Sequence, residues 1–93
     1  MPGTNKINVS KIIIILESLL LEEKGEILAI NREMDIRTKF QLDDIDITEL
    51  VMELEEEFKT SIDDKEITLI TESSEKITPI VLTKLVNKSL KMK

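Results

Sequence analysis

Residues 40–58 read FQLDDIDITELVMELEEEF and contain the clearest helical pattern in the chain. The apolar residues recur at three- and four-residue spacing, which places them on one face of a helix: Ile47, Leu50, Val51, Leu54 and Phe58. Acidic residues occupy the opposite face. Asp44 or Asp46 is expected to cap the start of this helix, because an aspartate there accepts an otherwise unpaired N–H.

Further helices are expected on both sides. Apolar spacing predicts a helix from residue 9, capped by Asn8 or Ser10 and ending near Gly25, a residue type typical of helix ends. Thr78 and Pro79 predict the start of another, because proline suits the first helical position. A short helix is expected over residues 63–68.

Residues 26–43 lack sustained periodicity and read as a long connection. The expected fold is therefore all-α: a small bundle of three main helices plus a short fourth, with a long loop between the first two. A flexible N-terminus, residues 1–8, is expected to precede a single domain, residues 9–91.

The composition excludes several classes of function. The chain has 93 residues and contains no histidine, cysteine, tryptophan or tyrosine, which removes histidine-based nucleophilic catalysis, zinc sites and disulfides. We expect no enzyme activity and no metal site. The net charge of −6 argues against nucleic-acid binding. No apolar run reaches the ~20 residues of a membrane span, so we expect a cytoplasmic location. We also expect a monomer.

The acidic residues are concentrated on one helix. Residues 43–57 contain eight acidic and no basic residues, whereas the rest of the chain contains 11 acidic and 13 basic residues. A solvated helix face explains such a run. A surface that steers basic partners is the second explanation. Like charges four residues apart destabilise a helix slightly, so their retention is an argument for such a use.

Residues 40–58 resemble the second helix of the acyl carrier protein family. That helix typically reads Asp-Ser-Leu-Asp, followed by an acidic helix rich in Leu, Val and Met that ends in Glu-Glu-Glu-Phe. Asp43, Ile45 and Asp46 match the motif in residue or type, and KITPIVLTKLVN, residues 76–87, resembles the family's last helix. The resemblance covers roughly residues 9–90 and implies an acyl-carrier-like bundle in fatty-acid, polyketide or related acyl metabolism.

The chain departs from the family at Asp44, which stands where the resemblance places the serine that takes the 4′-phosphopantetheine arm. No cofactor is therefore expected on this chain, although phosphopantetheine would be expected if residue 44 were serine. Three explanations remain open. The first is that Asp44 is native to a relative that is not loaded. The second is that it is an engineered substitution, and the third is that it is only a helix cap in a diverged helical protein.

The resemblance also implies which residues contact partners, namely basic surfaces of acyl-carrier-dependent enzymes and a phosphopantetheinyl transferase. The implied partner-binding residues are Asp43, Asp46, Glu49, Met52, Glu55 and Glu56. The residues implied to line an acyl cavity, or simply to form the core, are Leu50, Val51, Leu54, Phe58 and Ile62. The alternative function is a structural or regulatory helical interaction protein that is not a carrier.

Overall fold

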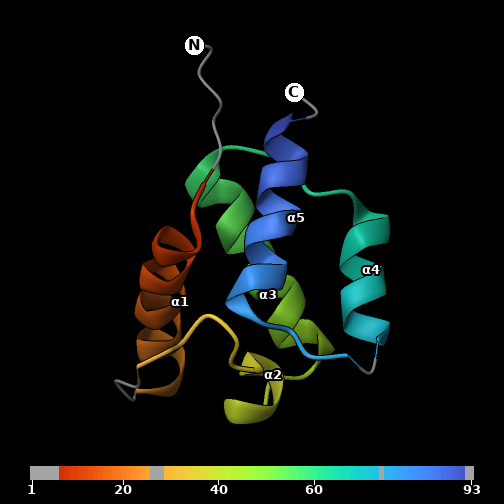
Figure 1. The fold of residues 1–93 in the computed structure, drawn as a ribbon. Coiled ribbons are helices and arrows are strands. Elements are labelled where there is room, and N and C mark those ends of the chain that lie inside the picture. The colour runs from red at the N-terminus through yellow and green to blue at the C-terminus, as the bar shows by residue number, and fades with distance from the viewer. Residues whose placement is uncertain (1–6, 26–28, 74, 92–93) are drawn as a thin grey trace.

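The computed structural model of the chain describes residues 7–25, 29–73 and 75–91. These residues form five helices (Figure 1): α1 (Val9–Lys24), α2 (Ile36–Lys39), α3 (Asp44–Phe58), α4 (Asp64–Glu72) and α5 (Pro79–Lys91). The described residues contain no strand, so the predicted all-α class is confirmed. Residues 1–6 of the expected N-terminal tail and residues 26–28 of the expected connection lie outside the described residues.

Local sequence explains where the main helices begin and end. The side chain of Asn8 accepts the backbone N–H of Lys11 at 3.1 Å and caps α1. Gly25 ends α1 in the left-handed conformation, at φ 70°, and its N–H donates to the carbonyl of Leu21. Thr78 caps α5 by accepting the N–H of Val81 at 3.2 Å. These predicted helix ends are confirmed.

Two expectations about the minor helices were incomplete. The expected loop before α3 contains α2, which buries Ile36 alone and is too short to produce a periodic pattern. The helix expected to end at residue 68 continues to Glu72, because Ile67 and Ile70 both pack against the core.

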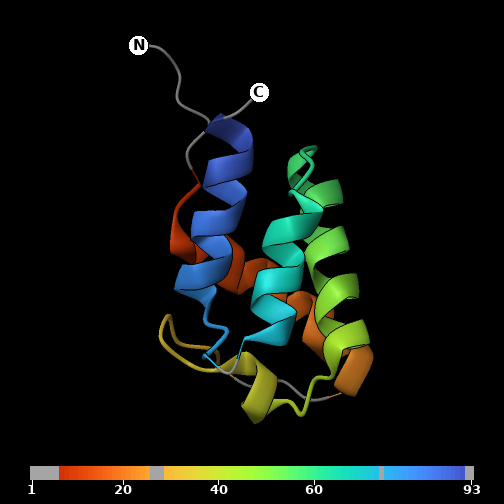
Figure 2. The ribbon, with the colours of Figure 1, turned by 90° about the vertical axis from the view of Figure 1, so that its right-hand side faces the viewer.

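The helices enclose one core that is aliphatic apart from Phe40, with Phe58 packed against it. Helix α1 packs on α5, and α3 packs on both α4 and α5, with α4 beside α3 on the side away from α1 (Figures 1 and 2). Fully buried side chains come from four of the helices and from the approach to α5, and include Ile12, Leu16, Ile36, Ile47, Leu54, Ile77, Leu82 and Val86. In the described part of the chain, no helix is long and apolar enough to cross a membrane.

Hydrogen bonds between distant residues hold the connecting segments. The N–H of Ile7 donates to the side-chain oxygen of Asn87 at 2.6 Å, and the amide of Asn87 donates back to the Ile7 carbonyl at 2.9 Å. Arg37 on α2 donates to the carbonyl of Glu75 at 2.6 Å and to that of Ile70 at 3.5 Å. The segment before α3 is therefore fixed to the end of α4 and the loop that follows it.

Candidate functional site

The start of α3 is closed by two aspartates that cap each other's backbone. The side chain of Asp43 accepts the N–H of Asp46 at 2.8 Å, and the side chain of Asp46 accepts the N–H of Asp43 at 3.2 Å. The expectation that Asp44 or Asp46 is the cap was therefore wrong, because the cap residue is Asp43 and Asp46 completes a capping box. Two of the implied partner-binding carboxylates thus also stabilise the helix.

Asp44 is the first residue of α3 and is exposed to solvent. Its backbone carbonyl accepts the hydroxyl of Thr48, one turn further along α3, at 2.8 Å. Its carboxylate lies at the positive end of the helix dipole, where negative charge is favourable. Position 44 is therefore accessible to another protein, and an aspartate suits this position in the fold.

The acidic face of α3 consists of exposed side chains along most of the helix. Glu49, Glu53, Glu56 and Glu57 are all exposed. Met52 lies among them with 56% of its surface exposed, so it does not belong to the core. An exposed methionine surrounded by carboxylates offers a partner an apolar contact within a negative field.

Glu55 differs from its neighbours. It is half-buried, and its carboxylate accepts the backbone N–H of Ile62 at 2.6 Å. The side chain therefore closes the turn between α3 and α4. The structure gives Glu55 a role in the fold, which the sequence pattern of adjacent glutamates did not reveal.

The residues implied to line an acyl cavity or to form the core lie on the inner side of the bundle. Leu50, Val51, Leu54 and Ile62 are buried, whereas Phe58 is half-buried and packs against the core. Leu50 and Ile62 also reach the walls of two surface hollows.

The larger hollow opens where the end of α3, the start of α4 and the end of α5 meet. Its volume is about 820 Å³, and Met52, Ile62 and Leu85 supply apolar parts of its wall. Its wall carries charges of both signs: Glu53, Glu55, Glu56, Asp63 and Glu66, with Lys59 and Lys88.

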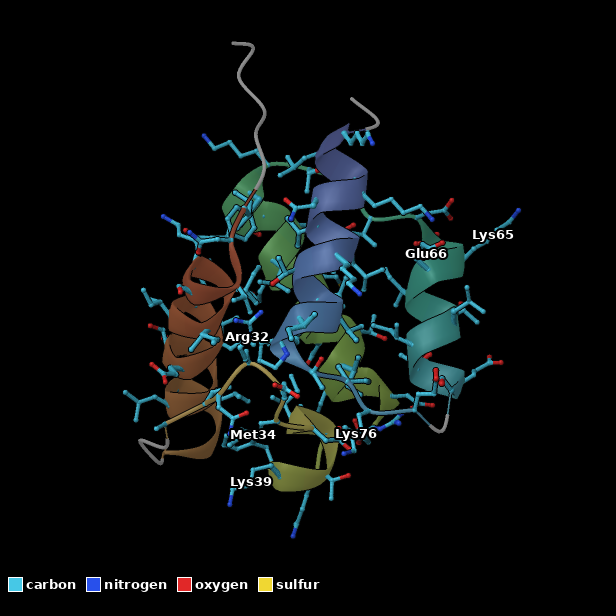
Figure 3. All side chains as sticks on the ribbon, in the orientation of Figure 1. Arg32, Met34, Lys39, Lys65, Glu66 and Lys76 are labelled. Atoms are coloured by element: carbon cyan, nitrogen blue, oxygen red, sulfur yellow. The ribbon has the colours of Figure 1, made fainter. Side chains whose placement is uncertain are left out.

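Two contacts between distant residues shape this hollow and were missed by sequence reasoning. Lys88 on α5 donates to Glu66 on α4 at 2.9 Å. Figure 3 shows that the neighbouring Lys65 lies on a different side of α4 from Glu66 and is directed away from the bundle. The buried hydroxyl of Thr60 donates to that of Ser89 at 3.0 Å. The pairs are 22 and 29 positions apart, so no local pattern indicates them.

The candidate site consists of exposed carboxylates and one exposed methionine on α3, beside a hollow whose wall carries charges of both signs. Among the described residues, no group of three or more histidine, cysteine, aspartate or glutamate side chains is arranged to hold a metal ion. Comparisons with protein-family models, curated proteins and solved structures give no match to this chain.

Proposed function

We propose that this protein is an acyl-carrier-like module that docks to enzymes of acyl metabolism through the acidic face of α3. One observation carries the proposal: position 44 is exposed in the first turn of a helix whose outer face is acidic and includes an exposed methionine. This arrangement agrees with the motif by which residues 40–58 resemble the acyl carrier protein family.

Asp44 determines what such a module does. A serine hydroxyl at this position would lose its proton and attack the phosphorus of coenzyme A that carries the pantetheine arm. The pyrophosphate bond would break, adenosine 3′,5′-bisphosphate would leave, and a phosphodiester to the phosphopantetheine arm would form. Attack by the carboxylate of Asp44 would instead form a mixed anhydride, which hydrolyses readily. The protein therefore competes with loaded carriers, scaffolds them or regulates their enzymes, and does not itself transport an acyl group.

Charge reversal on α3 tests the docking surface. We would measure the binding of the protein to an immobilised phosphopantetheinyl transferase at increasing salt concentration. The test variant reverses three exposed carboxylates of α3 to lysine, at Glu49, Glu53 and Glu56. Glu55 is left intact because its reversal would also remove the acceptor of the Ile62 N–H.

A matched variant controls for net charge. Glu33, Glu72 and Glu75 are exposed and lie outside α3, so their reversal to lysine changes the net charge equally. We expect salt-sensitive binding to the transferase by the unaltered protein and by the control variant, and loss of this binding in the α3 variant. Equal loss in both variants, or no binding by the unaltered protein, would favour a structural or regulatory helical protein that is not a carrier.

A further inference from the structure

A second hollow, which we call the α1–α3 groove, lies between the C-terminal half of α1 and the outer face of α3. Its volume is about 340 Å³. Among the residues that the structure describes, the charged ones that line it are all carboxylates: Glu22 from α1, and Asp46, Glu49 and Glu53 from α3. The larger hollow differs, because two lysines contribute to its wall.

The floor of the α1–α3 groove is formed by leucines of three segments. Leu20 of α1, Leu42 before α3 and Leu50 of α3 line it, with exposed fractions of 3%, 8% and 6%. Leu19 is half-buried beside them, and the exposed Met52 forms part of the wall. The groove therefore combines an aliphatic floor with a rim of one charge sign.

We propose that the α1–α3 groove binds a lysine- or arginine-rich amphipathic segment of a partner protein, which seats an aliphatic side chain on the leucine floor. The carboxylate rim complements the basic side chains of such a segment and speeds its encounter. The leucine floor supplies an apolar anchor point of the kind that contributes most to affinity. An acidic segment would place like charges against all four rim residues.

This inference rests on the proposed docking role of α3, and it adds α1 to the surface. Glu22 and Leu19 belong to α1 and have no part in the motif around position 44. The inferred partner therefore contacts both α3 and α1 through one segment. A basic patch that faced α3 alone would not meet this condition.

A model peptide tests the groove directly. The probe is a helical peptide of about four turns with lysines on one face, leucines on the other and a single tryptophan among the leucines. The protein contains no tryptophan or tyrosine, so the tryptophan emission comes from the peptide alone. We expect binding at low salt with a shift of the emission to shorter wavelength.

Two charge reversals separate the groove from the general acidity of the protein. Glu22→Lys alters the rim from α1, whereas Glu57→Lys makes the same charge change at an exposed residue of α3 that lines neither hollow. Glu22→Lys is expected to weaken binding about fivefold and Glu57→Lys less than about twofold. A peptide with serines in place of its leucines is expected to bind at least about tenfold more weakly.

Other outcomes would overturn the inference. Equal weakening by Glu22→Lys and Glu57→Lys, or equal binding of the serine peptide, would show that only the overall charge attracts the probe. Amide shifts in nuclear magnetic resonance spectra confined to the larger hollow would place the segment elsewhere. The peptide assay contains no carrier-dependent enzyme, so its failure is distinguishable from loss of transferase docking.

Discussion

The carboxylate of Asp35 accepts the backbone N–H of Ile77 at 3.1 Å, and the carbonyl of Ile77 accepts the N–H of Ile36 at 2.9 Å. This reciprocal pair joins the segment before α2 to the approach to α5, 42 positions away. The other oxygen of the Asp35 carboxylate accepts the hydroxyl of Thr38 at 2.8 Å. The Asp35 side chain and the Ile36 N–H thus both bind Ile77, and together they join the connection before α2 to the connection before α5.

The Asp35 contacts predict a pH-dependent contribution to stability. Burial alone would raise the pKa of Asp35, but the hydrogen bonds from the Thr38 hydroxyl and the Ile77 N–H, together with the nearby backbone N–H groups of Arg37 and Thr38, outweigh it and lower the pKa. A lowered folded pKa means that this stability is present above the unfolded pKa, about 3.9, and is lost as the pH falls through the folded value.

Asp35→Ala is therefore expected to reduce the free energy of unfolding by about 1–2 kcal/mol at neutral pH, because the Ile77 N–H loses its acceptor. Urea unfolding of both proteins between about pH 7 and pH 2 measures the difference. The difference should shrink on the acidic side. A difference that stays constant over this range would contradict the assigned role of the charge.

The capping box of α3 predicts a cost for removing Asp43. Asp43→Ala leaves the N–H of Asp46 without its acceptor and is expected to lower the free energy of unfolding by about 1 kcal/mol. Asp43→Asn is the matched control, because an asparagine oxygen still accepts this N–H. Thermal unfolding followed by circular dichroism measures both variants, and equal destabilisation would argue against the cap.

The left-handed conformation of Gly25 at the end of α1 predicts that a side chain there lowers the free energy of unfolding through backbone strain alone. Its φ of 70° disfavours a side chain, although a Cβ at this position would meet no atom of the described residues within 4 Å, its two chain neighbours apart. Gly25→Ala is expected to cost about 1 kcal/mol, and Gly25→Asn less, since asparagine tolerates the left-handed region. Urea unfolding measures the two variants. Identical stability of Gly25→Ala and the unaltered protein would show that α1 does not end in this conformation.

The two adjacent glutamates at the end of α3 are expected to differ. Glu55→Ala removes the acceptor of the Ile62 N–H and should lower the free energy of unfolding by about 1 kcal/mol. Glu56→Ala removes an exposed side chain and should change it by less than about 0.5 kcal/mol. Chemical unfolding distinguishes the two, and a larger effect at Glu56 would reverse their assigned roles.

Local sequence was sufficient for the main helices and insufficient for contacts between them. Both ends of α1 and the start of α5 follow from Asn8, Gly25 and Thr78, whose side chains or conformations act within four residues of the helix end. The extension of α4 depends instead on tertiary packing of Ile67 and Ile70.

At the candidate site, too, local sequence predicted some features, and others depend on three-dimensional geometry. The helical period places Glu49, Glu53, Glu56 and Glu57 opposite the apolar face, and the structure confirms that they are exposed. Met52 is exposed, as the resemblance implied. The identity of the cap did not follow, because Asp43, Asp44 and Asp46 are all suitable cap residues and only backbone geometry distinguishes them. The groove rim contributed by Glu22 depends on how α1 lies against α3, which no local pattern encodes.

The most direct measurement of the carrier-like proposal is an intact mass after incubation with coenzyme A and a broad-specificity phosphopantetheinyl transferase. Asp44→Ser is compared with the unaltered protein and with Asp64→Ser. Asp64 is the control because it is also exposed and is also the first residue of a helix, α4, capped by the preceding aspartate. We expect Asp44→Ser alone to gain the mass of one phosphopantetheine. If Asp44→Ser remains unmodified, or if the unaltered protein or Asp64→Ser gains this mass, the assignment of position 44 is contradicted.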